Sequence, residues 1–133
     1  FALFNETTGQ NFRKHLMSLQ ELHMGLGSAL YAMAKADGRL QSEETETLRM
    51  LLLNDPDARP ALEAFDIQDK YDVPAEEAYE YALRRFQAHR KHLDEATKKR
   101  FVGIMEQLAN AFDDTSRKEN ELLKRFRRDL KKL

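Results

Sequence analysis

Apolar residues recur three and four positions apart along most of this 133-residue chain, the spacing that gives an α-helix one apolar face. No stretch of the sequence alternates apolar and polar residues with the period of two that a half-buried strand requires. Pro56, Pro60 and Pro74 fall between the periodic stretches, where they would punctuate helices rather than interrupt them. The pattern therefore predicts an all-α fold without a sheet.

Six periodic stretches each predict an amphipathic helix. Their apolar positions are Phe12, Leu16 and Leu19; Leu26, Leu30, Met33 and Ala34; Leu48, Leu51 and Leu52; Ala75, Ala78, Tyr79, Ala82, Leu83 and Phe86; Phe101, Ile104, Met105, Leu108 and Phe112; and Leu122, Leu123, Phe126 and Leu130. A shorter, seventh helix is expected around residues 58–65. A chain of this length builds one core, so we expect residues 1–133 to form a single domain, a bundle of six or seven short to medium helices.

The composition excludes several classes of function. Hydrophobic residues make up 41% of the chain and charged residues 34%, which fits a packed core beneath a charged surface. The chain has no cysteine, so a disulfide framework, a thiolate nucleophile and a cysteine-ligated metal are excluded. The sequence also contains no nucleophile elbow and no glycine-rich phosphate loop. We therefore expect a protein that is not an enzyme.

The longest uncharged stretch, residues 22–34, is too short to cross a bilayer and is interrupted by Gly25, Gly27 and Ser28. The chain begins on Phe1 rather than methionine, which leaves open an anchor further upstream. We expect a cytoplasmic protein, which contacts a membrane only if such an upstream segment exists.

Acidic and basic residues are unevenly distributed. Residues 37–80 carry thirteen acids and four bases, whereas residues 84–133 carry fifteen bases and eight acids. Such asymmetry is typical of solvated helix faces, and it can also mark a binding surface. The last segment, "KRFRRDLKKL", keeps a helical apolar stripe, so we expect a terminal helix whose basic face binds a protein partner rather than nucleic acid. The expected partner-binding residues are Lys124, Arg125, Arg127 and Arg128.

The polar stretch "ADGRLQSEETE", residues 36–46, can be explained as helix punctuation. Gly38 can adopt the positive φ that ends a helix, and Ser42 can cap the next helix by accepting a backbone N–H. The glutamates after Ser42 would lie in the first helical turn, where the helix dipole favours negative charge. In this interpretation the polar residues serve the local structure alone.

A similar layout recurs 75 residues later in the chain. The residues Met33, Ala34, Ala36, Glu44, Glu46 and Leu48 align with Leu108, Ala109, Ala111, Glu119, Glu121 and Leu123. We infer an internal pseudo-repeat of two helix-turn-helix units. In the second unit Ser116 and Glu119 have the spacing of a capping box, and Phe112-Asp113 stands where the first unit has Asp37-Gly38.

The second interpretation of these turns is a site for a hard divalent cation, because converging carboxylates suit Ca²⁺ or Mg²⁺. Asp37 and Glu44 match positions five and twelve of an EF-hand calcium loop. Met33 and Lys35, however, stand where the first two acidic ligands of that loop belong. A cation would therefore need carboxylates from both turns, and the residues leave both interpretations open.

The segments "MAKADGRLQSEETETL" and "HLDEATKKRFVGIMEQLANAFDDTSRKENELL" resemble the TerB (tellurite resistance) family and its TerB-like relatives. The resemblance covers about residues 12–130. It implies an all-α fold of two overlapping four-helix arrangements, no known catalysis, and a part in bacterial tellurite and general stress resistance. It also implies a metal-linked or partner-binding role.

The resemblance places Asp37 and Glu44 in the first acidic motif of the family and Glu119 at the matching position of the second. Asp113 and Asp114 are approximate counterparts, because family members repeat Asp-Gly where this chain has Phe112-Asp113. We expect these five carboxylates to form the functional surface, with Ca²⁺ or Mg²⁺ as its cofactor. A metal-free helical protein-interaction domain is the alternative function.

The histidines are weaker candidates for a site. His89 and His92 would share a helix face at a spacing that suits a metal pair, but Arg90 and Lys91 beside them would repel a cation. We expect these two histidines to be exposed. His15 and His23 lie near apolar positions, and we expect packed or surface residues rather than ligands.

Overall fold

The computed structural model describes residues 6–36, 42–110 and 117–133 of the chain. The described residues form α-helices joined by turns and two short 3₁₀ helices, and they contain no strand, which confirms the all-α prediction. The elements in chain order are α1 (Glu6–Ala34), α2 (Ser42–Leu53), η1 (Pro56–Ala58), α3 (Arg59–Lys70), α4 (Ala75–Ala88), η2 (Arg90–His92), α5 (Glu95–Asn110) and α6 (Arg117–Lys131).

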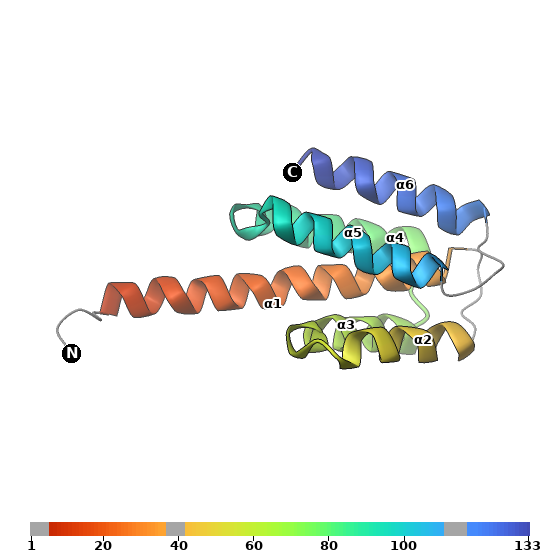
Figure 1. The fold of residues 1–133 in the computed structure, drawn as a ribbon, viewed down its shortest axis with the longest axis horizontal. Coiled ribbons are helices and arrows are strands. Elements are labelled where there is room, and N and C mark those ends of the chain that lie inside the picture. The colour runs from red at the N-terminus through yellow and green to blue at the C-terminus, as the bar shows by residue number, and fades with distance from the viewer. Residues whose placement is uncertain (1–5, 37–41, 111–116) are drawn as a thin grey trace.

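The long helix α1 lies at the centre of the bundle. Figure 1 shows it between the α2–α3 pair on one side and α4, α5 and α6 on the other. It makes its most extensive contacts with α3 and α4 and also touches α5 and α6, while α2 packs against α3 and α5. From residue 22 to residue 34 every α1 residue except Met24 is buried. This half of α1 is therefore the axis on which the other helices assemble.

The structure corrects the prediction at the start of the chain. The first two periodic stretches belong to one helix of 29 residues, not to two short helices. Gly27 lies inside this helix. Its missing side chain lets α1 approach the backbone of α3, since a Cβ added to Gly27 would lie 2.0 Å from the Ala61 carbonyl oxygen. The expected apolar face of the first stretch is not buried, since Phe12 is 58% and Leu16 44% exposed.

The three prolines stand at helix starts, as the sequence predicts. Pro56 begins η1, Pro60 lies in the first turn of α3, and Pro74 is the residue before α4. The short helix expected around residues 58–65 is α3, which continues to Lys70. Asp55 caps η1, because its Oδ1 accepts a 3.0 Å hydrogen bond from the Asp57 backbone N–H.

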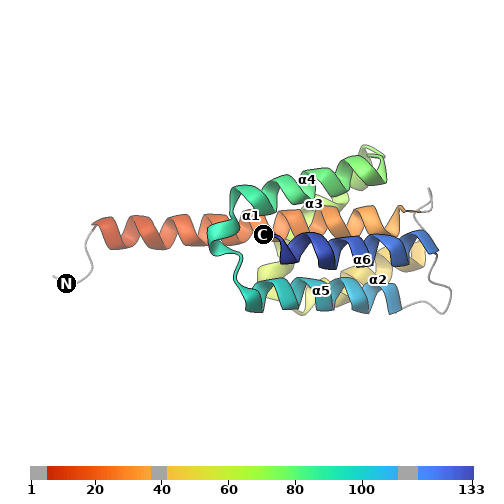
Figure 2. The same ribbon diagram turned by 90° about the horizontal axis from the view of Figure 1, so that it is seen from above.

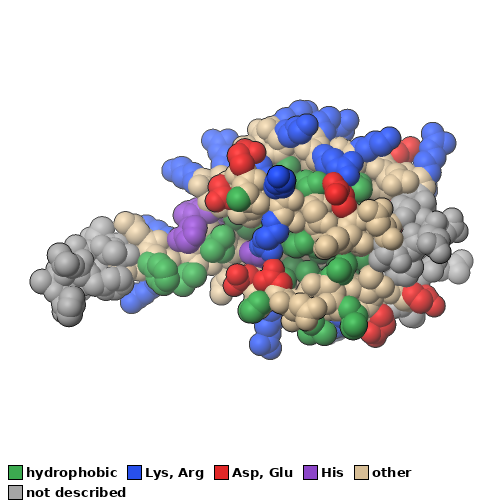
Figure 3. All heavy atoms as spheres, viewed as in Figure 1, with side chains coloured by type: hydrophobic (Ala, Val, Ile, Leu, Met, Phe, Trp, Pro, Cys, Tyr) green, Lys and Arg blue, Asp and Glu red, His purple; other side chains and the backbone are tan. Residues whose placement is uncertain are grey.

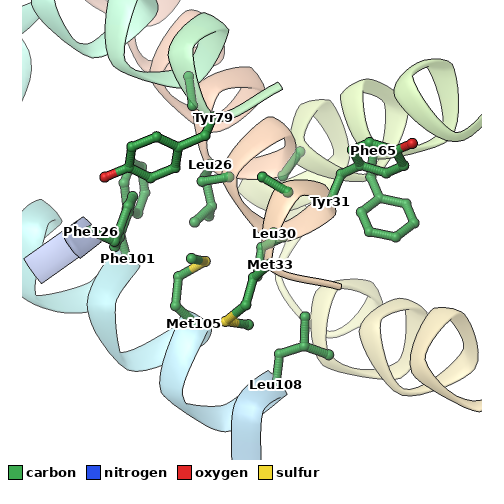
Figure 4. Close-up of a cluster of buried hydrophobic side chains, with 14 of the residues drawn as sticks. Leu26, Leu30, Tyr31, Met33, Phe65, Tyr79, Phe101, Met105, Leu108 and Phe126 are labelled. Atoms are coloured by element: carbon green, nitrogen blue, oxygen red, sulfur yellow. The ribbon is translucent and has the colours of Figure 1, made fainter. Parts of the chain in front are cut away.

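The core is filled from two sides of α1. Figure 4 shows Leu26, Leu30 and Met33 reaching toward Phe101, Met105 and Phe126, while Tyr31 turns to Phe65 on the other side. All of these side chains are fully buried. Two buried tyrosines satisfy their hydroxyls: Tyr31 donates to the Val73 carbonyl oxygen at 2.8 Å, and Tyr79 donates to the Asp129 carboxylate at 2.6 Å. Within the described part of the chain, no helix is both long enough and apolar enough to cross a membrane.

The acidic-turn end of the bundle as a candidate site

The four helix ends that flank the two acidic turns lie at the same end of the bundle. In both Figure 1 and Figure 2, α1 and α5 end there and α2 and α6 begin there. The two helix-turn-helix units therefore have the same orientation in the bundle. The pseudo-repeat in the sequence corresponds to two helical hairpins, α1–α2 and α5–α6, whose connected helix ends lie at one end of the molecule.

A hollow of about 390 Å³ joins the two hairpins at this end. Ala36 contributes to it from just beyond the end of α1, and the first turns of α6 contribute from the opposite side. The start of α4 closes the third side. Its lining residues are Ala36, Ala75, Glu76, Lys118, Glu121, Leu122 and Arg125. The end of the first unit and the start of the last helix are thus near neighbours.

The predicted metal ligands are only partly within the described residues. Asp37, Asp113 and Asp114 lie outside them, and Glu44 lies near the start of α2 without a described side chain. Glu119 is in the first turn of α6, is 7% exposed and is engaged in an interaction within the fold. No group of three or more histidines and acids in the described part of the chain could hold a metal ion. Both interpretations of the acidic turns remain predictions.

Arg125, one of the predicted partner-binding residues, joins α6 to α4 beside this hollow. Its guanidinium binds both carboxylate oxygens of Glu76, at 2.7 and 2.8 Å, and lies 4.3 Å from the centre of the Tyr79 ring. The hydrogen bonds from Arg125 lower the pKa of Glu76, and Glu76 in turn raises the pKa of Arg125. Burial, together with the hydrogen bond to Asp129, raises the pKa of Tyr79.

Of the other predicted partner-binding bases, Arg127 is also used within the fold. It donates to Glu106 of α5 at 2.7 and 3.2 Å. Lys124 and Arg128 are exposed and form no ion pair with another described residue. The structure therefore separates the four predicted partner-binding residues into two that hold helices together, Arg125 and Arg127, and two that face solvent, Lys124 and Arg128.

A second basic feature, which the sequence analysis did not single out, lies between α5 and α6. A hollow of about 380 Å³ has Val102 and Leu130 in its lining together with several basic side chains. The charged lining residues are Glu95, Lys98, Lys99, Arg127 and Lys131. The adjacent lysines at positions 98 and 99 were the sequence signal for it, but their proximity to α6 depends on how α5 and α6 pack.

The histidines on the α4–α5 connection differ from the prediction. His89 follows the end of α4 and His92 lies in η2, so the two do not share a helix face, and both are half-buried rather than exposed. Each contacts α1: His92 Nδ1 lies 2.8 Å from His15 Nδ1, and His89 Nδ1 lies 3.1 Å from Ser18 Oγ. Figure 3 shows histidine side chains where α1 leaves the bundle. These contacts fasten α1 to the connection.

His23, expected to be either packed or on the surface, is packed. Its Nδ1 lies 2.7 Å from the Leu19 carbonyl oxygen, which can only accept, and its Nε2 faces the Arg100 guanidinium, which can only donate. The ring is therefore the neutral tautomer that carries its proton on Nδ1. Burial lowers the pKa of His23, and the positive charge of Arg100 lowers it further.

The comparisons with known proteins identify one family. Its sequence model, described as "Tellurite resistance protein TerB", matches residues 23–131 of the chain. No curated protein and no solved structure matches. The match includes both helix-turn-helix units. It begins at His23, so the exposed first half of α1 lies before the matched region.

Proposed function

The chain belongs to the TerB family, and from this premise we propose that it is a non-catalytic, stress-associated binding module of the tellurite-resistance type. We place its action in the bacterial cytoplasm. We propose that its functional surface is the end of the bundle where α1 and α5 end and α2 and α6 begin. More specifically, we propose that a divalent cation binds there.

One observation carries this proposal: the end of α1 and the start of α6 line the same hollow. In the sequence, the first turn follows the end of α1 and the second precedes the start of α6. Asp37 and Glu44 belong to the first turn, and Asp113, Asp114 and Glu119 to the second. Carboxylate oxygens are the ligands that Ca²⁺ and Mg²⁺ prefer, and the absence of cysteine removes the softer alternatives.

A cation at this position would depend mainly on the four carboxylates whose side chains are not described. Glu119 is buried and engaged, and the neighbouring Glu76 and Glu121 are paired with Arg125 and Arg117. The described acids near the hollow are therefore already engaged within the fold. The donor set that remains for a cation is Asp37, Glu44, Asp113 and Asp114.

A second candidate function is a metal-free protein-interaction domain. The observation that favours it is the set of large apolar side chains on the surface, since clusters of such residues are typical of interaction sites. Met50 and Leu53 lie one turn apart on α2, and each is more than 60% exposed. Lys124 and Arg128 of α6 would contribute a basic contact to an acidic partner on another face.

Isothermal titration calorimetry with Ca²⁺, Mg²⁺, Mn²⁺ and Zn²⁺ separates the two candidates. Wild type should give binding heat with Ca²⁺ or Mg²⁺ and Asp37→Asn should not, because the variant loses one anionic ligand. Glu77→Gln is the matched control: it removes an exposed carboxylate from α4, which forms no ion pair with another described residue, and should bind as wild type does. The cation should also raise the melting temperature of wild type.

Two results would remove the metal from the proposal. One is wild-type protein that gives no heat with any of the four cations. The other is heat that Asp37→Asn leaves unchanged. Either result leaves the metal-free interaction domain as the function of this fold.

A further inference from the structure

The first half of α1 extends beyond the rest of the bundle, as Figure 1 shows. All eight residues from 10 to 17 are exposed, so among the described residues these two helical turns are largely uncovered, apart from the contact of His15 with His92. They nevertheless include three large apolar side chains: Phe12 is 58% exposed, Leu16 44% and Met17 63%. Figure 3 shows hydrophobic side chains gathered on this part of the helix.

One stripe of α1 residues, apolar except for His23, forms a continuous seam along the helix. From the first to the last they are spaced alternately four and three positions apart, which is the pattern of a helix that packs against a second helix along its length. The seam consists of Phe12, Leu16, Leu19, His23, Leu26, Leu30 and Met33. From His23 onward its residues are buried by the bundle, whereas Phe12 and Leu16 are exposed. The seam therefore continues beyond the point where its partners in this chain end.

A groove of about 560 Å³ lies at the transition between the two halves of α1. Leu16, Leu19 and His23 of the seam line one side, and Pro56 and Pro60 line the other. Phe12, one helical turn before Leu16, is not among the residues that line this groove. The molecule thus has a groove with both apolar and charged lining residues, and an exposed phenyl ring that does not line it in the same copy.

We infer that a second copy of this chain docks on this face, with the two α1 helices antiparallel and a two-fold axis between residues 17 and 18. In that register Leu16 faces Leu19 of the second copy, and Phe12 comes level with His23, over the groove. Each copy thereby supplies the ring that fills the groove of the other. Such a self-complementary, closed contact is the commonest symmetry of soluble oligomers.

Charge also favours this occupant. Arg13 on the extended half forms no ion pair with another described residue. On the rim of the groove, Asp57 likewise has no ion-pair partner among the described residues. The arginines of the rim already face carboxylates, in the pairs Arg59–Glu63 and Arg100–Asp55. The antiparallel arrangement brings Arg13 of one copy toward the free carboxylate of Asp57 of the other.

One flank of the seam is already fastened to the body. His15, Ser18 and Glu21 are spaced three residues apart and follow this flank of α1. They contact His92, His89 and Arg85, respectively. These contacts fix the position of this part of α1 relative to the bundle. The docking surface is therefore preorganised, which lowers the entropic cost of association.

Sedimentation velocity over a range of concentrations tests whether the dimer forms. The contact contains about four layers of side chains, so we expect a dimer with a dissociation constant on the order of micromolar. Phe12→Glu should be monomeric with unchanged helical content, because position 12 is exposed in the monomer. Lys14→Glu, a charge change away from the seam, should still dimerise. Wild type that stays monomeric at hundreds of micromolar would overturn the inference.

Cysteine cross-linking tests the antiparallel register, because the natural chain has no cysteine to interfere. Leu16→Cys and Leu19→Cys, mixed and mildly oxidised, should form a disulfide-linked heterodimer several times faster than either variant links to itself. Lys14→Cys, away from the seam, should remain unlinked. Fast linking of each variant to itself would indicate parallel helices and would overturn the antiparallel arrangement. None of these measurements involves the acidic turns, so their outcome is independent of the metal proposal.

Discussion

The two halves of α1 carry the same apolar seam, yet one is the most buried segment of the molecule and the other the most exposed. Between residues 22 and 34 only Met24 is not buried, whereas residues 10–17 are all exposed. The difference lies in their neighbours, since α3 and α4 pack along the second half. Apolar periodicity identifies the face of a helix that will be covered. It does not identify what covers that face.

The difference between the two halves is tested most strongly by truncating a leucine to alanine in each half. Leu30→Ala should lower the free energy of unfolding by about 3 kcal/mol, because a fully buried leucine leaves a cavity. Leu16→Ala, with a side chain 44% exposed, should cost less than about 1 kcal/mol in the monomer. Urea unfolding measures both losses, at a protein concentration below the dissociation constant of the proposed dimer. Equal losses would contradict the account of α1.

The second prediction concerns the close approach of backbones that only the buried half makes. Gly27→Ala should destabilise the protein by about 2 kcal/mol, because the added Cβ would lie 2.0 Å from the Ala61 carbonyl oxygen and force α1 and α3 apart. Gly103→Ala is the matched control on α5: nothing lies within 4 Å of its added Cβ, so it should stabilise by about 0.5–1 kcal/mol. Thermal unfolding of both variants tests this, and a neutral Gly27→Ala would show that α1 and α3 are further apart.

The third and smallest effect lies at His23, where α1 enters the bundle. Burial lowers the pKa of His23 in the folded state, so below about pH 6.5 the unfolded chain takes up a proton that the folded protein resists. The contribution of His23 to the free energy of unfolding is fully present above that pH. It decreases as the pH falls, by at most about 1.4 kcal/mol per pH unit. His23→Gln should flatten the dependence of the unfolding free energy between pH 7 and 5. An unchanged slope would mean that His23 is not the group responsible.

Much of the fold was predictable because it depends on local signals. Apolar spacing located the helices, and proline marked the starts of α3 and α4. The same signals failed where distant parts of the chain decide the outcome. Gly25 and Gly27 are weak helix formers, yet α1 continues through them because α3 and α4 pack against it. Spacing also could not indicate that the bundle leaves the first half of α1 uncovered.

In the candidate site, too, the sequence predicted the local features and missed the contacts between distant residues. The sequence predicted two similar helical hairpins, and their helix ends lie together at one end of the bundle. It could not predict that Arg125 binds Glu76, because the two residues are 49 positions apart and meet only when α6 packs on α4. The contact between His15 and His92, 77 positions apart, was hidden for the same reason. The roles of Asp37, Asp113 and Asp114 stay predictions, since these residues lie outside the described part of the chain.

The most direct test of the central claim, that the acidic-turn end of the bundle is the functional surface, is a ¹H–¹⁵N NMR titration with Ca²⁺ and Mg²⁺. We predict saturable shifts confined to amides in the two turns and in the adjoining ends of α1, α2, α5 and α6. Amides of the α4–α5 connection and of the extended half of α1 should not move. Shifts centred on those remote regions, or no shifts with either cation, would contradict a cation site at this end.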